Sequence, residues 1–325
     1  MASSKKLQKA RAIKNDEFYT RLEDIEQECA NYISYFKGKT VLCNCDDPRI
    51  SQFFHYFSYN FEFLGLKKLI TTCYKNTNPN LFTQYKSEKA VFLEYTGDKD
   101  GNKIPDSSEI EVIELKGDGD FRSEECIELL KQADIVCTNP PFSLFREYLA
   151  QLIEYKKDFL IIGNKNAISY KQTFKLIKEN KIWPGVRGFS GGMWFTVSPD
   201  SDNFDRITDK GEKQKNVPAI WLTNIDHKKR HQELILYKTY KGNESDFPQY
   251  DNYEAINVNK TCDIPIDYEG IMGVPISFLD KYNPEQFEIL GDSRYHDEQD
   301  FADDINIIKG KLLFRRILIR NKKVS

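Results

Sequence analysis

The sequence predicts an α/β protein built on a parallel, doubly wound β-sheet, followed by a smaller and less regular region. The first observation is that apolar runs of strand length alternate with amphipathic stretches of helical length between residues 40 and 180. The second is that this alternation is lost beyond residue 181, and that residues 240–300 are rich in turns and tyrosine. We therefore expect one domain over residues 1–225 and a second, irregular one over residues 226–325.

The N-terminal part of the expected sheet contains three strands and one long helix. The helix is predicted because aromatic residues recur at helical spacing and a glycine follows them. The strands are predicted from short apolar runs bounded by polar or turn-forming residues. In order, we expect a strand at 40–45, a helix at 51–64 ended by Gly65, a strand at 67–74, and a strand-like patch at 91–95 inside a polar excursion over 75–110.

The stretch from 111 to 180 has the clearest alternation. Ser123 and Ser143 each precede an apolar helical face, so we expect their hydroxyl groups to cap the two helices that follow. Glu124 and Glu125 in the first turn favour the same helix start. The expected elements are strands at 111–115, 134–138, 158–163 and 218–224, helices from Ser123, from Ser143 and over 170–180, and a long polar loop at 198–217.

Composition excludes several classes of protein. No apolar run approaches 18 residues and the N-terminus lacks a hydrophobic segment, which disfavours a membrane or secreted protein. The seven cysteines form no CxxC pair, so we expect reduced thiols in a cytoplasmic protein, with no disulfide framework and no metal site. The chain has no Pro-Cys dipeptide, which disfavours cytosine C5 methylation, and the zinc deaminase signature is also absent.

The net charge of −3 conceals an uneven distribution. Residues 1–14 contain five basic residues and residues 305–325 contain seven, and neither segment has an acidic residue. The rest of the chain therefore carries a net charge of −15. Basic arms on an acidic body are compatible with contacts to phosphate groups. Two solvated termini are the alternative interpretation.

The strongest chemical signal is the run Asn139, Pro140, Pro141 and Phe142, which directly follows a buried strand. Average residue usage gives this run by chance in about one in a thousand chains of this length. Proline removes backbone donors, so the Asn139 side-chain oxygen and a proline carbonyl offer two acceptors for a planar amino group. Accepting both hydrogens favours a tetrahedral nitrogen and frees its lone pair for attack, while Phe142 can stack on the attached ring. A rigid strand-to-helix turn is the alternative.

Acidic residues follow two other expected strands. Asp46 and Asp47 close the strand at 40–45, and Asp120 with Phe121 follows the strand at 111–115. Ligands of doubly wound sheets bind beyond the carboxyl ends of the strands. Carboxylates there can accept hydrogen bonds from a ribose hydroxyl or an adenine amine, and Phe121 can flank an adenine. Acidic turns after strands are also common without any function.

These segments together resemble the EcoRI-type family of adenine-specific DNA methyltransferases, which use S-adenosylmethionine. The resemblance spans nearly the whole chain and is therefore much more specific than the Asn-Pro-Pro-Phe run alone. The segments that carry it are DEFYT (16–20), CNCDDPRIS (43–51), LITTCY (69–74), GDGDFRS (117–123), TNPPFSLF (138–145), FLIIGN (159–164), WLTN (221–224), GNES (242–245), YDNYEAINVNKT (250–261) and GVPISFL (273–279).

The resemblance implies a Rossmann-like class I methyltransferase sheet over 1–225 and a DNA target-recognition region over 226–325. It also implies roles for individual residues. The target amine is held by Asn139, Pro140, Pro141 and Phe142, and S-adenosylmethionine is held by Phe18, Tyr19, Thr20, Asp46, Asp47, Asp120 and Phe121.

Transfer to an adenine in duplex DNA requires the base to leave the stack. We expect Phe142 on one side of the flipped base and Trp194 or Phe195 on the other. Ordinary core packing is an equal alternative for Trp194. Phosphate contacts are expected from Lys228, Lys229 and Arg230, and from lysines of the 198–217 loop, although solvated loops explain these residues as well.

The chain departs from the wider methyltransferase pattern at two places. The turn after the first strand contains no glycine, so the cofactor turn must be built differently. The strand at 67–74 also lacks an acidic residue at its end to bind the ribose, and Glu94 is a candidate substitute.

The function expected from the sequence is transfer of a methyl group from S-adenosylmethionine to N6 of adenine in double-stranded DNA. The expected setting is the bacterial cytoplasm, on DNA, with a monomeric protein encoded by the bacterium or by a phage. The resemblance implies an AATT-centred site such as GAATTC. A cognate restriction endonuclease would act separately, unless the enzyme is an orphan relative. The alternatives are methylation of an RNA adenine or a protein glutamine amide, and a non-catalytic DNA-binding module.

Overall fold

The computed structural model describes residues 18–45, 51–73, 90–102, 104–106, 109–189, 191–293, 295–296, 299–300 and 305–324. The chain forms two compact units. The first contains Met1–Ile168 and Gly185–Ile225, and the second contains Ser169–Pro184 and Asp226–Ser325.

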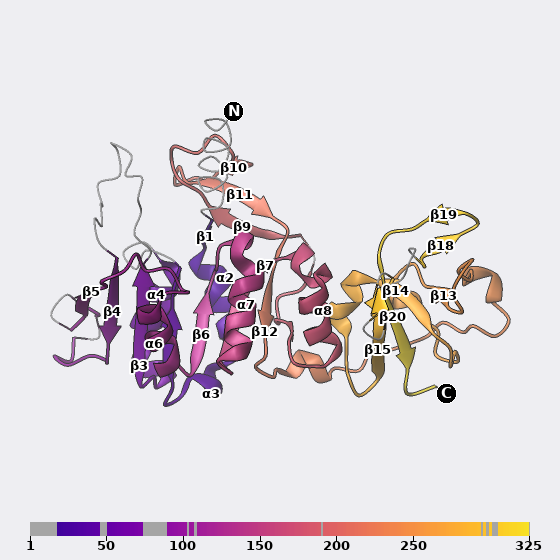
Figure 1. Ribbon diagram of the computed structural model, residues 1–325, viewed down its shortest axis with the longest axis horizontal. Coiled ribbons are helices and arrows are strands. Elements are labelled where there is room, and N and C mark those ends of the chain that lie inside the picture. Colours follow the sequence, from indigo (N-terminus) through magenta and orange to yellow (C-terminus); the bar gives the residue numbers. More distant parts are fainter. Residues whose placement is uncertain are drawn as a thin grey trace. The chain divides into compact units, whose positions relative to one another are not determined.

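The first unit is built on a mixed β-sheet (Figure 1). Its strand order is β5-β4-β3-β2-β6-β7-β12. The four central strands, β3-β2-β6-β7, are parallel as predicted. By contrast, β4 is antiparallel to β3, β5 is antiparallel to β4, and β12 is antiparallel to β7. The strands are β2 (Thr40–Cys43), β3 (Lys68–Cys73), β4 (Val91–Tyr95), β5 (Glu111–Glu114), β6 (Ile135–Thr138), β7 (Asp158–Asn164) and β12 (Ala219–Thr223).

Helices cover both faces of this sheet. Val41, Ile135 and Leu160 project into one apolar core together with side chains of the first four helices, whereas the alternate residues Leu42 and Val136 face the other side. On that other side α6 contacts β2 and α7 contacts β7. The helices are α2 (Leu22–Cys29), α3 (Ile33–Phe36), α4 (Gln52–Tyr59) and α5 (Phe61–Leu64) on the first face, and α6 (Glu124–Gln132) and α7 (Phe145–Glu154) on the second.

Local capping explains some of the helix boundaries. The Ser123 hydroxyl accepts a hydrogen bond from the Cys126 N–H at the start of α6, as predicted. The helix expected over 51–64 is divided at Asn60 into α4 and α5, and Gly65 ends it in the left-handed conformation with φ 61°. The prediction for Ser143 is wrong. Ser143 lies inside the short 3-10 helix η1 (Phe142–Leu144), and Leu144 occupies the cap position of α7.

A second, smaller sheet of the first unit has the order β1-β9-β11-β10. Part of the region expected to be a long polar loop thus forms two strands, because polar residues of β10 and β11 pair in register. The segment that starts at Phe18 enters a strand rather than a helix. The strands are β1 (Tyr19–Thr20), β9 (Met193–Thr196), β10 (Arg206–Ile207) and β11 (Lys213–Val217).

The second unit contains more regular structure than the sequence predicts. Its main sheet has the order β13-β14-β20-β15-β16-β17, and most of these strands are too short to produce a clear alternating pattern. Its elements are α8 (Lys171–Lys178), β8 (Trp183–Pro184), η3 (Lys228–His231), η4 (Glu244–Asp246), η5 (Thr261–Asp263), β13 (Ile256–Asn257), β14 (Met272–Pro275), η6 (Ile276–Lys281), β15 (Phe287–Asp292), β16 (Tyr295–His296), β17 (Gln299–Asp300), β18 (Ile307–Ile308), β19 (Lys311–Leu312) and β20 (Arg316–Asn321). The 3-10 helix η2 (Lys165–Ser169) spans the point at which the chain leaves the first unit.

The basic segment at 305–325 is not a solvated tail. Its residues 316–321 form β20, which pairs with β14 on one side and with β15 on the other. Arg315 donates to the Ser169 carbonyl at 2.8 Å and binds Asp292, and Arg316 is 8% exposed. The N-terminal basic segment, residues 1–14, lies outside the described residues.

Two expectations from composition can be compared with the described part of the chain. None of its helices has the length and the apolar composition that a membrane span needs. Six of its cysteines are free thiols, of which Cys29, Cys43, Cys126 and Cys137 are buried and Cys45 and Cys262 are not.

Candidate functional site

The turn after β6 is held in place by the turn after β2. The two strands are parallel neighbours, so both turns lie at the same edge of the sheet. The Thr138 hydroxyl donates to the Asn44 carbonyl, and the Tyr148 hydroxyl donates to the Asn44 side-chain oxygen. All three residues are buried. This network fixes the backbone from which Asn139 and Pro140 extend.

Asn139 has one anchored and one unpaired polar atom. Its Nδ2 donates to the carbonyl of Phe18 over 2.7 Å. Its Oδ1 is buried, and within the described residues it has no hydrogen-bond partner. A buried polar atom without a hydrogen bond is unfavourable unless a ligand supplies that bond. The bond to Phe18 therefore orients the amide so that its oxygen remains available to a donor.

Three phenylalanine rings pack against one another, and we call Phe18, Phe142 and Phe195 the aromatic cluster. The rings of Phe18 and Phe142 are stacked, with centroids 6.0 Å apart and planes inclined by 28°. Phe195 meets Phe18 at 5.7 Å and meets Phe142 edge-on at 6.4 Å. Phe195 is fully buried, whereas Phe18 and Phe142 are half-buried. The two half-buried rings are thus the ones that a planar ligand could reach.

Trp194 does not belong to the aromatic cluster. Successive residues of a strand point to opposite faces, so Trp194 of β9 lies on the face opposite to Phe195. The Arg206 guanidinium lies over the indole ring at 3.8 Å from its centroid. Of the two alternatives for the second stacking residue, the structure brings Phe195 next to Phe142 and leaves Trp194 in a cation–π pair.

The segment Phe18–Thr20 is joined to the same site through β9. Tyr19 pairs with Thr196 and Thr20 pairs with Phe195. Thr20 is buried, and its Oγ1 has no hydrogen-bond partner among the described residues. The site therefore contains two buried polar atoms, Thr20 Oγ1 and Asn139 Oδ1, that none of the described protein groups satisfies.

Asp120 and Phe121 lie at the carboxyl edge but are already engaged. The Asp120 carboxylate binds Arg122 at 2.6 Å, and this hydrogen bond lowers the pKa of Asp120. Phe121 packs edge-on against Tyr148 with centroids 5.0 Å apart. Its carbonyl accepts from Gln151 at 3.0 Å. The Tyr148 contact links Phe121 to the Asn44 network beneath the turn after β6.

The remaining acidic candidates differ in what is known of their position. Asp46 and Asp47 lie outside the described residues. Glu94 is described, and the prediction that it substitutes as a ribose ligand is wrong. It pairs in register with Ile70 near the start of β3, away from the carboxyl edge, and its carboxylate binds Lys68 at 3.1 Å.

The basic run in the second unit is only partly available to a ligand. Lys228 is exposed. Lys229 binds Asp280 at 2.5 Å, and the Arg230 guanidinium lies 3.6 Å from the centroid of the Trp183 ring. Contacts between these three basic residues and DNA stay a prediction.

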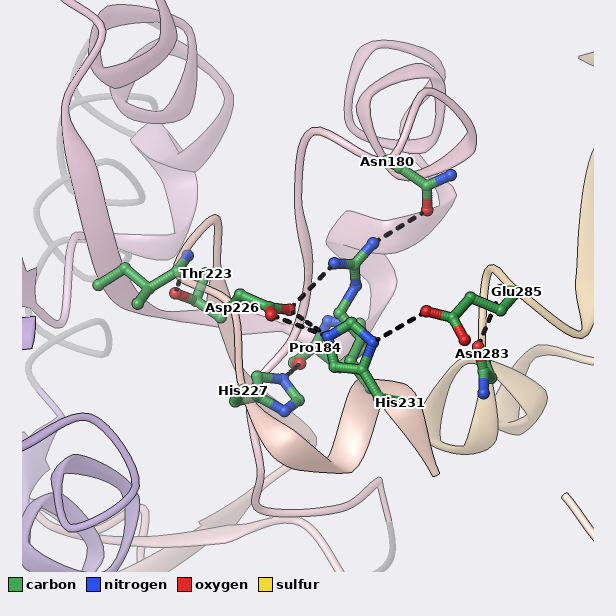
Figure 2. A network of polar contacts seen from close by, with 10 residues as sticks. Asn180, Pro184, Thr223, Asp226, His227, His231, Asn283 and Glu285 are labelled. Atoms are coloured by element: carbon green, nitrogen blue, oxygen red, sulfur yellow. Dashed lines mark hydrogen bonds and ion pairs between the residues drawn. The ribbon is translucent and has the colours of Figure 1, made fainter. Parts of the chain in front are cut away.

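Arg230 also binds Asp226 at 3.2 Å, and Asp226 belongs to a polar network centred on His231 (Figure 2). His231 lies between Asp226, at 2.8 Å, and Glu285, at 3.5 Å. The hydrogen bond to Asp226 raises the pKa of His231. Burial would raise the pKa of Asp226, but the bonds from His231 and Arg230 outweigh it and lower that pKa. Arg230 additionally donates to Asn180 at 3.2 Å.

Sequence reasoning missed the residues that position the site. In the sequence, Asn44 lies within an expected strand and Thr138 at the end of another. Tyr148 lies on an apolar helix face. Their only sequence signal is polarity within otherwise apolar segments, which does not identify a partner about a hundred residues away.

Comparison with known proteins gives one family over nearly the whole chain. The family model described as adenine-specific methyltransferase EcoRI matches residues 6–322. Type II methyltransferase M.EcoRI of Escherichia coli is 50% identical over 334 residues, which cover 100% of this chain and 98% of the relative. No solved structure matches the chain.

Two relatives come from mycoplasmas. Type II methyltransferase M.MpnI of Mycoplasma pneumoniae is 39% identical over 339 residues, with 97% of this chain and 98% of the relative covered. A type II methyltransferase of Mycoplasma genitalium is 41% identical over 290 residues, with 87% of this chain and 84% of the relative covered.

Proposed function

The chain belongs to the EcoRI family of adenine-specific methyltransferases, and from this premise we propose that it methylates N6 of adenine at a specific site in double-stranded DNA. The observation that carries the proposal is Asn139, whose amide nitrogen is anchored to Phe18 while its buried oxygen has no partner among the residues that the structure describes. An adenine amine brings two N–H donors, which suits the Asn139 oxygen and the Pro140 carbonyl.

The aromatic cluster supports a flipped purine as the acceptor. Phe142 is half-buried and adjoins Asn139, so its ring can stack on a base whose amine reaches the Asn139 oxygen. Phe195 braces Phe142 from the buried side. A base inside duplex DNA must leave the helix to enter such a site.

S-adenosylmethionine fits the residues present at this edge. Thr20 Oγ1 is a second buried polar atom, without a partner in the described part of the chain, and Thr20 pairs with Phe195 between β1 and β9. Phe18, Tyr19 and Thr20 would hold the methionine part, with Asp46, Asp47, Asp120 and Phe121 toward the nucleoside. When bound, the cofactor supplies an electrophilic methyl group on its sulfonium.

The fold supports this assignment as well. The parallel strands β3-β2-β6-β7, with helices on both faces, support a Rossmann-like class I methyltransferase sheet. The second unit would then supply target recognition. We propose that the protein acts as a monomer and serves as the modification partner of a separate restriction endonuclease.

A methyl-transfer assay with three acceptors tests the proposal. The protein is incubated with tritiated S-adenosylmethionine and with duplex DNA, RNA or a protein mixture, and the labelled product is identified after digestion. We expect N6-methyladenine from DNA. Label in RNA or in protein glutamine instead would refute the acceptor. Failure to bind S-adenosylmethionine in calorimetry would favour a non-catalytic DNA-binding module.

The recognition site requires a separate experiment. The family resemblance favours an AATT-centred site such as GAATTC. Methylation-sensitive sequencing of DNA from cells that express the protein would identify the methylated positions directly. Methylation at an unrelated motif would refute this site and leave the chemistry intact.

A further inference from the structure

The loop between β4 and β5 contains a group of carboxylates that the methyl-transfer site does not use. Asp98, Asp100 and Glu109 each place a carboxylate oxygen within 4.8 Å of the others. Two oxygens bound to one Ca²⁺ at about 2.3–2.6 Å can be up to about 5 Å apart. The observed separation is therefore one that a single cation can bridge.

Glu109 is the residue that points to a ligand. It is 4% exposed, and within the described part of the chain its Oε2 has no hydrogen-bond partner. Its Oε1 accepts the Lys99 N–H at 2.5 Å. A buried carboxylate oxygen beside two further carboxylates is unfavourable unless a cation or a proton neutralises it.

The neighbouring side chain of Tyr95 is affected by the same negative charges. Tyr95 ends β4 and is almost fully buried. Burial raises the pKa of Tyr95 to about 12, and the charges of Glu109 and Asp98 add to this rise. The buried end of the loop is therefore an electronegative environment.

The spacing of the oxygen ligands matches a calcium-binding loop. In a 12-residue loop of the EF-hand type, ligands come from positions 1, 3, 5, 7, 9 and 12, with a backbone carbonyl at position 7 and glutamate at position 12. The corresponding residues here are Asp98, Asp100, Asn102, Ile104, Asp106 and Glu109. The pattern departs at position 6, where Lys103 replaces the usual glycine, and strands rather than helices flank the loop.

We propose that Asp98, Asp100 and Glu109 bind one Ca²⁺ ion, with the Asn102 side chain and the Ile104 carbonyl as further ligands. Calcium is favoured over magnesium because the ligand set is rich in protein oxygens, whereas Mg²⁺ retains several waters. Because of Lys103 and the missing helices, the expected Kd lies between about 10⁻⁵ and 10⁻³ M.

The position of the loop makes this a structural ion rather than a catalytic one. Tyr95 pairs with Leu69 near the start of β3, so the loop lies at the edge where the parallel strands begin. Asn139 follows the carboxyl end of β6, at the opposite edge. The ion would fix the β4–β5 connection and would leave methyl transfer unchanged.

Calorimetry on the chelator-treated full chain tests the proposal. Titration with CaCl2 should give one site per chain, and Ca²⁺ at 100 times Kd should raise Tm by about 5 °C. Glu109→Gln and Asp100→Asn should each weaken Ca²⁺ binding at least tenfold. Glu111→Gln, which removes an exposed carboxylate just outside the loop, serves as the matched control and should bind normally.

Several outcomes would overturn the proposal. They are the absence of both heat and a Tm shift at about 10 mM CaCl2, tighter binding of Mg²⁺ than of Ca²⁺, and unaltered Ca²⁺ binding in both loop variants. Asp100 is exposed, so Asp100→Asn keeps the test decisive even if Glu109→Gln fails to fold. The result does not depend on the methyl-transfer proposal, because it is measured without DNA and cofactor.

Discussion

Replacing Asn139 with alanine should nearly abolish methyl transfer while the protein stays folded. The substitution removes the buried Oδ1 that we assign to the adenine amine, and it also removes the donor that holds the Phe18 carbonyl at 2.7 Å. The two losses act on different quantities. Loss of the acceptor affects the transition state, and loss of the donor affects the native fold.

The expected magnitudes separate the two effects. A hydrogen bond between neutral groups contributes about 1 kcal/mol net, so the free energy of unfolding should fall by about 1–2 kcal/mol. Loss of one preorganised polar group at a reacting centre typically costs a factor of about 10²–10³, or about 2.7–4 kcal/mol of activation free energy. The loss of activity should therefore exceed what the loss of stability explains.

Single-turnover transfer of tritiated methyl to a DNA duplex is the appropriate assay, because it isolates the chemical step. DNA binding by fluorescence anisotropy and cofactor binding by calorimetry should remain within about threefold of wild type, since neither requires the Asn139 oxygen. Asn139→Asp keeps an acceptor oxygen but loses the donor to Phe18. It should lose only about tenfold in rate, because half of the interaction is preserved.

Asn60→Ala provides a matched control. Asn60 Nδ2 donates to the Tyr56 carbonyl at 2.8 Å, so the same kind of bond is lost elsewhere in the first unit. This variant should lose stability but not the rate of transfer. Normal turnover by Asn139→Ala would refute the role of Asn139, and so would an equal loss of rate in Asn60→Ala.

Four further predictions concern the aromatic cluster, the basic residues and the charged network. Phe142→Ala should lower the rate of transfer at least tenfold through lost stacking. Trp194→Ala, which breaks the pair with Arg206, should change that rate less than threefold in the same assay. A larger loss of rate in Trp194→Ala than in Phe142→Ala would assign the base to Trp194. Arg230→Ala should destabilise the protein by about 1–3 kcal/mol in urea unfolding, because the contacts of Arg230 with Trp183 and Asp226 are lost. Lys228→Ala should leave stability unchanged and should reduce the slope of log affinity for DNA against log salt by about 1. The pKa of His231 is raised, so its bond to Asp226 stabilises the fold fully below the unfolded-state pKa of about 6.5, and this contribution is lost as pH rises through the folded-state value. Because the pair is half exposed, the difference in free energy of unfolding between wild type and His231→Gln should change by less than about 1 kcal/mol between pH of about 5.5 and 8.5. A larger difference at the higher pH would contradict the sign. Deleting residues 1–14, which carry five basic residues, should flatten the dependence of log affinity on log salt by up to about 4, and an unchanged slope would show that this segment does not contact phosphate.

The prediction from sequence was most accurate for local structure. Short apolar runs located β2, β3, β4, β6 and β7 within one or two residues, because a strand buried on both faces, such as β2 or β6, consists of neighbouring apolar residues. Ser123 and Gly65 were identified as helix boundaries because capping depends on groups only a few residues apart. The prediction that Ser143 caps α7 was wrong because η1 lies before this helix, which begins at Phe145.

Strand direction was less predictable than strand position. A strand that returns antiparallel has the same apolar pattern as a parallel one, so the pattern of β4 and β12 did not reveal their direction. The second unit was underestimated for a related reason. Strands of two residues, such as β13, contain too few positions to show a period.

The sequence by itself determined the family and supplied the motif that we propose holds the target amine, because Asn139 to Phe142 and the other matching segments are fixed by residue type and spacing. Only the tertiary structure decided how that motif is presented. The bond from Asn139 to Phe18 joins residues 121 positions apart, and it decides which amide atom stays unpaired. The packing of β9 likewise decides that Phe195, and not Trp194, adjoins Phe142. Local patterns specify which groups the chain carries, whereas the satisfaction of a buried polar group depends on partners that only folding brings together.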